Sequence, residues 1–167
     1  RAGNGGDGGG SADSNGGDGG QGGTTADQAA DGLPSVNLTA EKGVRIVINP
    51  EDNNQGIGLL GQSTGGQGGN GGNGGTFGHS GDGNDGGYAG PVVVNNLGNI
   101  ELHLSQNEAS SGGAGILVQS VGGQGGDAGS SGISLVTYGN TGGSGGPGED
   151  VSVTHQGIII TSGTAAI

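Results

Sequence analysis

A twelve-residue phrase occurs twice in the chain, and this internal repeat constrains the fold more than any other sequence feature. Residues 58–69 read GLLGQSTGGQGG and residues 115–126 read GILVQSVGGQGG, an offset of 57 residues. A short valine-rich stretch precedes each copy, at residues 36–38 and 92–94, and a third lies at residues 151–153. We therefore expect successive units that stack on one another and place equivalent side chains in register.

Glycine is concentrated in three blocks. It accounts for 49 of the 167 residues, and 39 of these glycines lie in residues 1–32, 65–90 and 122–150. Averaged over the chain, the scarcity of Val, Ile, Leu and Phe and the net charge of -12 indicate disorder. Between the blocks, however, residues 36–60 and 92–121 are dense enough in aliphatic side chains to form a core.

The aliphatic segments have the periodicity of strands. Residues 36–38, 46–48, 100–104 and 151–153 alternate or run continuously in apolar residues, and most of these are β-branched. No stretch shows helical spacing over two turns. Each unit is predicted to contain a strand, a glycine-marked bend, a strand, a polar bend, a strand and a glycine-rich excursion. The expected glycine bends lie at Gly43, Gly98 and Gly157, and the polar bends at residues 49–54 and 106–111.

This organisation predicts an all-β fold, a parallel β-helix or β-solenoid with essentially no α-helix. Successive rungs would place Val36, Val92 and Val151 in one inward ladder, with Gln62 above Gln119 and Ser63 above Ser120. Because a few rungs bury little core and leave sheet edges open, we expect the chain to be a fragment of a longer repeat protein. The predicted parts are a preceding excursion (1–32), a first repeat (33–91, strands 36–64, glycine block 65–90), a second repeat (92–150, strands 92–121, glycine block 122–150) and the start of a third (151–167).

The glycine blocks have a three-residue period of the form Gly-Gly-X, clearest at residues 16–24, 65–76 and 122–127. Three residues per turn is the repeat of a polyproline II helix, which would place every X on one edge. The two remaining glycine edges could pack closely through backbone contacts. We consider stacked polyglycine II helices and flexible surface loops as alternatives, since glycine loses the most entropy on ordering. Amide exchange in residues 65–75 distinguishes them.

The repeated phrase at residues 58–69 and 115–126, and the approach to another at residues 160–167, resemble the repeats of large glycine-rich autotransporter passenger domains of Gram-negative bacteria, which use type V secretion. The resemblance covers residues 36–167, and residues 1–32 are similar to the excursion of a preceding repeat. It implies a right-handed parallel β-helix on the cell surface or released from it, acting as an adhesin or structural stalk. Mycobacterial Gly-Gly-X arrays are similar in the glycine blocks but fit the Gln-Ser phrase less well.

Composition excludes several function classes. The three basic residues, Arg1, Lys42 and Arg45, cannot neutralise a phosphate backbone, so nucleic acid is not an expected partner. The absence of cysteine excludes disulfides and thiolate metal sites. No run of about 18 apolar residues is present, so this segment is not expected to span a membrane.

No catalytic or cofactor-binding residue is predicted, and we expect a protein that is not an enzyme. Residues 61–65 match the G-x-S-x-G pattern of a nucleophile elbow, which requires a helix after the serine. A polyglycine run follows instead, and Val118 replaces Gly61 in the second copy, so Ser63 is interpreted as a ladder residue. His79, His103 and His155 lie in unrelated contexts without ligand-like spacing, and His103 is expected to point outward from its strand.

Calcium is a weak alternative. Residues 80–88 fit the nonapeptide G-G-x-G-x-D-x-U-x imperfectly, which makes Asp82 and Asp85 weak calcium candidates. Gly87 takes the aliphatic position and no second copy follows, so solvated acidic loops are the competing interpretation.

The sequence therefore predicts a non-enzymatic extracellular segment of a large repetitive bacterial surface protein, with a structural or adhesive role. A self-assembling extracellular filament or matrix subunit is the alternative, and a calcium-binding repeat protein is a lesser one. Expected partners are neighbouring repeats of the same or identical chains and a surface receptor or matrix that the sequence does not identify. Electron microscopy distinguishes isolated stalks from uniform fibres.

Overall fold

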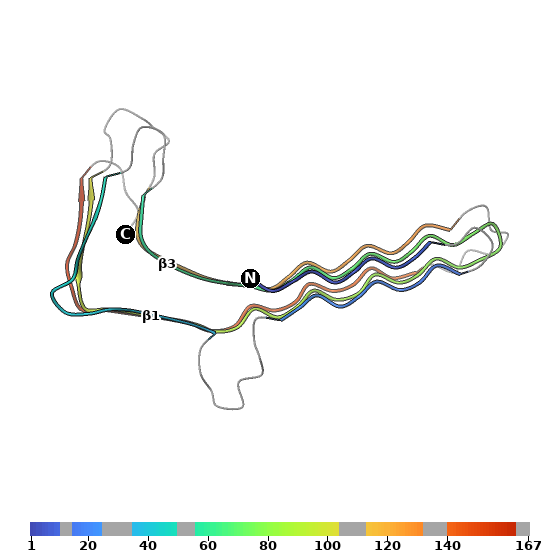
Figure 1. Ribbon diagram of the computed structural model, residues 1–167, viewed down its shortest axis with the longest axis horizontal. Helices are drawn as coiled ribbons and strands as arrows, with labels where there is room; N and C mark the ends of the chain where they lie inside the picture. Colours follow the sequence, from blue (N-terminus) through green and yellow to red (C-terminus); the bar gives the residue numbers. More distant parts are fainter. Residues whose placement is uncertain (11–14, 25–34, 50–55, 104–112, 132–139, 163–167) are drawn as a thin grey trace. The chain divides into compact units, whose positions relative to one another are not determined.

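The computed structural model describes residues 1–10, 15–24, 35–49, 56–103, 113–131 and 140–162 (Figure 1). These residues contain strands and no helix, and therefore no helix that could cross a membrane. The predicted all-β class is confirmed, and most of the strands are short aliphatic segments rich in β-branched residues. The strands are β1 (Val36–Ala40), β2 (Arg45–Ile48), β3 (Ile57–Thr64), β4 (Val92–Asn96), β5 (Asn99–His103), β6 (Ala114–Val121), β7 (Val151–His155) and β8 (Ile159–Ser162).

The strands form three open parallel sheets. Their orders are β1-β4-β7, β2-β5-β8 and β3-β6, so each strand pairs with its counterpart in the next repeat. The predicted valine ladder is confirmed, since Val36 pairs with Val92 and Val92 with Val151. Gln62 also lies over Gln119, with its Nε2 donating to the Gln119 Oε1 at 3.0 Å. Equivalent segments of successive sequence repeats therefore form neighbouring strands of the same sheet.

The core of these sheets is centred on the middle repeat. Val92, Val94, Ile100 and Leu102 are all fully buried. Complete burial of one such side chain stabilises a fold by roughly 1.5–3 kcal/mol. The equivalent Val151 in the third repeat is 46% exposed. Stacking on both sides is thus what completes the core of a repeat. Partly buried residues of the first and third repeats pack around the core: Val36, Leu38, Ile46, Ile48 and Ile159.

The glycine-marked bends differ in length between repeats. Val36 pairs with Val92, an offset of 56, whereas Arg45 pairs with Asn99, an offset of 54, so the first bend is two residues longer. Gly43 takes up this extra length with a φ of 89°, a conformation that favours glycine. Gly98 consequently lies beside Val44 rather than Gly43. Residues 50–54 and 106–111 of the predicted polar bends are not among the described residues.

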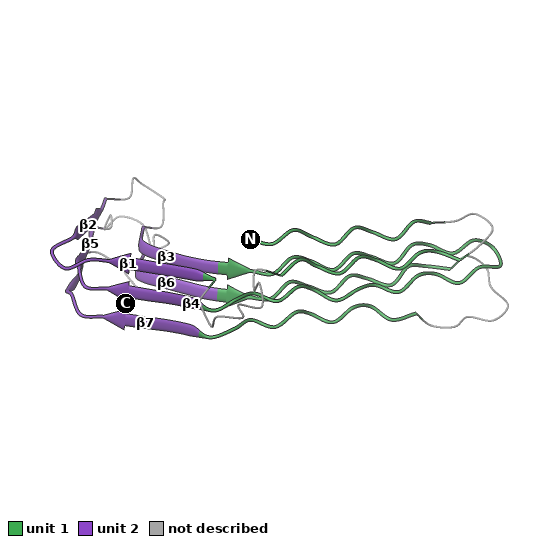
Figure 2. Ribbon diagram, turned by 60° about the horizontal axis from the view of Figure 1, so that its bottom comes forward, with its two compact units in different colours: residues 1–35, 63–91, 120–150 green, residues 36–62, 92–119, 151–167 purple. Residues whose placement is uncertain are grey.

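The chain forms two compact units, and each draws segments from all three repeats (Figure 2). The strand unit comprises residues 36–62, 92–119 and 151–167, and the glycine-rich unit comprises residues 1–35, 63–91 and 120–150. In the glycine-rich unit, outgoing segments (1–10, 65–75 and 122–131) run antiparallel to returning segments (15–24, 78–90 and 140–149). Their backbones are directly hydrogen-bonded, as between Gly69 N and Gly20 O at 2.7 Å.

Candidate functional site

The glycine-rich unit is built on a hydrogen-bonding period of three residues. Each triplet consists of an X residue, a first glycine and a second glycine. In the middle outgoing segment, the X amide donates to a side chain of the preceding repeat, the first glycine to the next repeat, and the second glycine to a returning segment. All three amides are thereby satisfied, as close packing requires. The bonds are Gln67 N to Asn4 Oδ1 (3.1 Å), Gly68 N to Gln124 O (2.8 Å), Gly69 N to Gly20 O (2.7 Å), Asn70 N to Asp7 Oδ1 (3.0 Å), Gly71 N to Asp127 O (2.8 Å) and Gly72 N to Gly17 O (2.7 Å).

Glycine is sterically required at the inner positions of these triplets. A Cβ added to Gly68 would lie well inside van der Waals contact with the Asn84 carbonyl, and one added to Gly69 would overlap the Gly6 carbonyl. Both obstacles are backbone atoms, which cannot move aside as a flexible side chain could. The returning segment departs from the pattern at Asn84, which takes a second-glycine position and donates its Nδ2 to the Gly19 carbonyl at 3.0 Å.

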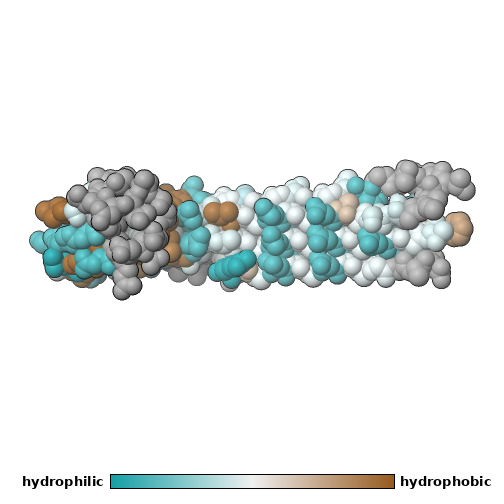
Figure 3. Space-filling model, turned by 90° about the horizontal axis from the view of Figure 1, so that it is seen from above, coloured by the Kyte–Doolittle hydropathy of each residue, from teal (hydrophilic) through white to brown (hydrophobic). Residues whose placement is uncertain are grey.

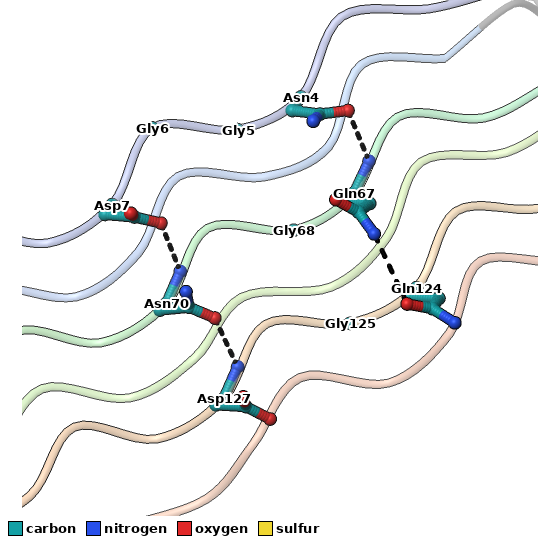
Figure 4. Close-up of a pocket in the computed structure, with 10 residues that line it drawn as sticks. All are labelled: Asn4, Gly5, Gly6, Asp7, Gln67, Gly68, Asn70, Gln124, Gly125 and Asp127. Carbon is teal, nitrogen blue, oxygen red and sulfur yellow. Dashed lines mark hydrogen bonds between the residues drawn. The ribbon is translucent and has the colours of Figure 1, made fainter.

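The X residues stand outside this backbone layer and form exposed columns across the outgoing segments (Figure 3). One column contains Asn4, Gln67 and Gln124, and the next contains Asp7, Asn70 and Asp127 (Figure 4). Between the two columns lies a polar groove of about 610 Å³ with glycine along its floor.

Hydrogen bonds join the members of each column. Gln67 Nε2 donates to Gln124 Oε1 at 3.3 Å. In the neighbouring column, the backbone N–H of Asn70 donates to Asp7 Oδ1. The side-chain Oδ1 of Asn70 in turn accepts the backbone N–H of Asp127 at 2.8 Å. The column side chains therefore present amide and carboxylate groups while they also bind adjacent repeats together.

The returning segments carry an equivalent set of columns, which includes both weak calcium candidates. Asp82 Oδ1 accepts the Thr141 amide at 3.0 Å, and Asp85 Oδ1 accepts the Ser144 amide at 2.7 Å. Each carboxylate thus binds the backbone of the next repeat. Across the part of the chain that the structure describes, no group of three His, Asp or Glu side chains could hold a metal ion. Calcium binding stays a prediction.

The two serines of the repeated phrase bind the bases of the glycine-rich hairpins. Ser63 is 1% exposed, and its Oγ accepts the amide of Gly90 at 2.9 Å. Ser120 Oγ accepts the amide of Glu149 at 2.9 Å and donates to the Gly90 carbonyl at 3.0 Å. Each serine therefore bonds to the end of the returning segment in its own repeat. Ser63, the serine of the nucleophile-elbow pattern, thus has a structural contact in the glycine-rich unit.

A charged cluster that the sequence reasoning missed lies on the β2-β5-β8 sheet. Arg45 donates to both carboxylate oxygens of Glu101, at 2.7 and 2.5 Å. This hydrogen bonding lowers the pKa of the Glu101 carboxyl and raises that of the Arg45 guanidinium. His103 is exposed, as predicted; its Nε2 lies 3.6 Å from Glu101 Oε2 and its Nδ1 lies 3.4 Å from Ser162 Oγ.

This cluster has the residue types of a Ser-His-carboxylate triad but a different geometry. Arg45 takes up both oxygens of Glu101, and the separations on either side of His103 are long for hydrogen bonds. The cluster is better described as a cross-strand ion pair with neighbouring polar side chains. In the register of β2 and β5, Arg45 lies opposite Asn99 and Glu101 lies opposite Val47, so the ion pair is diagonal, and the sequence alone did not indicate this register.

A second feature missed by sequence reasoning is the fully buried Asn96. Its Oδ1 accepts the Gly98 amide at 3.0 Å, which orients its Nδ2 toward His155 Nδ1, also at 3.0 Å. The side chain therefore holds the bend between β4 and β5.

No protein family matches the chain, and no curated protein does. A solved structure with a weak likeness is that of a springtail antifreeze protein from Granisotoma rainieri, described as a nine polyproline type II helical bundle. The two sequences are 20% identical over 98% of this chain and 89% of the other, with a TM-score of 0.14.

Proposed function

We propose that the chain is a non-enzymatic structural or adhesive segment of a large, repetitive extracellular protein on a bacterial surface. The observation that carries this proposal is the recurrence of equivalent contacts from repeat to repeat. Asp7 binds the Asn70 amide as Asn70 binds the Asp127 amide, and Val36 pairs with Val92 as Val92 pairs with Val151. Such contacts can be extended by adding repeats, which suits a scaffold that displays the same side chains many times.

The finer fold belongs to the same proposal. Three short strands per repeat, each paired in parallel with its counterpart, support a parallel β-helix, which the autotransporter resemblance would make right-handed. The three-residue bonding period of the outgoing segments supports polyglycine II helices rather than flexible loops.

The columns of the glycine-rich unit are the proposed display surface. Their amide and carboxylate groups offer hydrogen-bond donors and acceptors to a polar, hydroxyl-rich surface such as a glycan. The net charge of -12 would repel polyanions and oppose close approach of neighbouring molecules at low salt.

Two measurements test the structural and adhesive roles separately. The structural role requires ordered glycine segments, so amides of residues 65–75 should exchange far more slowly than in a random coil. Exchange at random-coil rates would eliminate the structural role.

The adhesive role predicts that beads coated with the chain are retained on glycan surfaces more than albumin-coated beads. Replacing Gln67 and Gln124 with alanine should reduce retention, and equal retention of both bead types would refute adhesion.

The filament alternative is favoured by exposed apolar side chains on the third repeat. Val151, Val153 and Ile160 are 46%, 47% and 49% exposed, and Ile158 is 60% exposed. Burial of these side chains against another copy would release apolar surface from water. Uniform fibres in electron micrographs of the purified chain would support this alternative, and isolated particles would oppose it.

A further inference from the structure

Glycine occupies positions at one end of the glycine-rich unit where nothing in the structure requires it. Gly3, Gly6 and Gly9 are the second glycines of the first outgoing segment, and they are exposed. A Cβ added to any of them would meet no atom within 4 Å, and the backbone φ of none lies in the left-handed region. Their counterparts in the middle segment, Gly66, Gly69 and Gly72, are buried, and a Cβ there would overlap the preceding segment.

The opposite end is also less crowded than the middle repeat, although it is not completely open. Gly142 and Gly145 are first glycines of the third returning segment, and both are exposed. An added Cβ would lie 3.3 Å from the Gly126 carbonyl oxygen at Gly142, a tight contact without overlap, and 3.6 Å from the Gly123 carbonyl oxygen at Gly145, an ordinary contact. Their counterparts in the middle repeat, Gly83 and Gly86, would bring a Cβ into overlap with carbonyls of the next outgoing segment.

Glycine at such open positions costs more conformational entropy than alanine and gains nothing within the unit. A further layer on each face would require it, as layers do in the middle of the unit. We propose that these two end faces bind each other, so that a second copy of this chain stacks head to tail on the glycine-rich unit. The first face is defined by Gly3, Gly6 and Gly9, and the second face by Gly142 and Gly145.

The backbone groups on the two faces are complementary. In the middle of the unit, Gly123 N donates to Gly87 O at 2.9 Å and Gly126 N to Asn84 O at 2.8 Å. Extended by one repeat, the same pattern joins Gly3 N of the second copy to Gly146 O, and Gly6 N to Gly143 O. Among the described hydrogen bonds, these amides donate none and these carbonyls accept none.

The side-chain columns continue in the same register. Asp7 Oδ1 accepts the Asn70 amide and Asn70 Oδ1 accepts the Asp127 amide, so Asp127 Oδ1 would accept the Asp7 amide of the second copy. Two carboxylates then lie in adjacent layers, as Asp18 and Asp82 already do within the chain. Because each copy has a net charge of -12, salt should strengthen the association by screening the repulsion.

The inference rests on the proposed structural role only in requiring ordered glycine segments, and it does not involve adhesion. A second copy is favoured over an unrelated partner because the bonding pattern demands three-residue spacing and glycine on the incoming surface; in a longer chain a neighbouring repeat would supply the same surface.

The test is sedimentation of the full chain over a range of concentrations in low and high salt. We expect species whose masses are multiples of 15.5 kDa, increasing with concentration and with salt. One variant with Gly3→Val and Gly6→Val blocks the first face, and another with Gly142→Val and Gly145→Val blocks the second. Each should be monomeric alone, whereas their mixture should form a dimer of about 31 kDa, twice the chain mass, because each retains the face that the other lacks. A monomeric wild-type chain, or a mixture that stays monomeric, would overturn the proposal.

A matched control is Gly10→Val. Gly10 is in the same segment but at an X position, where an added Cβ lies 3.6 Å from the Asn73 carbonyl, an ordinary contact. This variant should associate as the wild type does. Slow amide exchange at Gly68 and Gly69 in every variant would show that the unit remains folded. A monomer with slow exchange overturns the stacking alone, whereas random-coil exchange in the wild type overturns the structural role.

Discussion

Asn70 Oδ1 accepts the backbone amide of Asp127 at 2.8 Å, across two repeats of the chain. A side chain that stands on the exposed face therefore also satisfies a main-chain donor of the next layer. Asn and Asp can both do this because each has an acceptor oxygen at the same distance from the backbone. This dual use explains why the column of Asp7, Asn70 and Asp127 contains these two residue types, and it leads to the first prediction.

Asn70→Ala removes the acceptor of the Asp127 amide. We expect a loss of about 1 kcal/mol in the free energy of unfolding, together with faster exchange of that amide. Asn70→Asp preserves the acceptor but adds a third carboxylate to the column, so its stability should recover as salt is added. Denaturant unfolding and amide exchange measure both effects. Unchanged exchange in Asn70→Ala would show that the side-chain bond is unimportant.

Gly69→Ala places a Cβ against the backbone carbonyl of Gly6. We expect a loss of about 1–3 kcal/mol in the free energy of unfolding, the usual range for overpacking, with the disturbance centred on residues 65–75. Gln67→Ala is the matched control, because its exposed side chain extends away from the backbone layer and its removal should change stability by less than about 1 kcal/mol. Equal stability of the two variants would contradict the steric role of glycine.

Leu102→Ala should destabilise the strand unit. Leu102 is fully buried in β5, so we expect a loss of about 2–5 kcal/mol in the free energy of unfolding. Leu60 in β3 is 50% exposed, and Leu60→Ala should cost much less. Thermal or denaturant unfolding measures both, and similar losses would show that the aliphatic core is not where the structure places it.

The Arg45–Glu101 pair predicts a pH dependence of stability. The pKa of Glu101 is lowered by the Arg45 hydrogen bonds, so the pair contributes stability above the unfolded-state pKa, about 4.3 for glutamate. That contribution is lost as the pH falls through the lowered folded-state pKa. Both Glu101→Gln and Arg45→Gln should reduce this acidic dependence, as measured by unfolding between pH 2 and 6. Wild-type dependence in either variant would mean that the exposed pair adds nothing.

Calcium should leave the melting temperature unchanged, because Asp82 and Asp85 each already bind a backbone amide. We expect identical melts in CaCl2 and in EGTA, and wild-type stability in Asp82→Asn, whose amide oxygen can accept the same bond. A calcium-dependent increase that is lost in a variant with both Asp82→Asn and Asp85→Asn would restore the calcium-binding alternative.

Much of the strand unit could be predicted because its signals are local. The valine-containing triplets at residues 36–38 and 151–153 lie in β1 and β7, and the similar position of Val36, Val92 and Val151 within each repeat aligned these residues. The Arg45–Glu101 pair could not be predicted, because aligning Gly43 with Gly98 gives the wrong register for β2 and β5. The two extra residues of the first bend become visible only when the strands are paired.

Three properties can be read from the order of residue types alone: the all-β class, the parallel pairing of the repeats, and the three-residue glycine period of the blocks. Those properties follow from side-chain spacing, which is local. Tertiary structure alone decided which atoms satisfy each amide: Asn70 for Asp127, Ser63 for Gly90, and Asn96 for Gly98. These partners depend on how closely two backbone segments that are far apart in the sequence approach each other in the fold. It also decided which glycines are enclosed by backbone and which, such as Gly6 and Gly145, face open space.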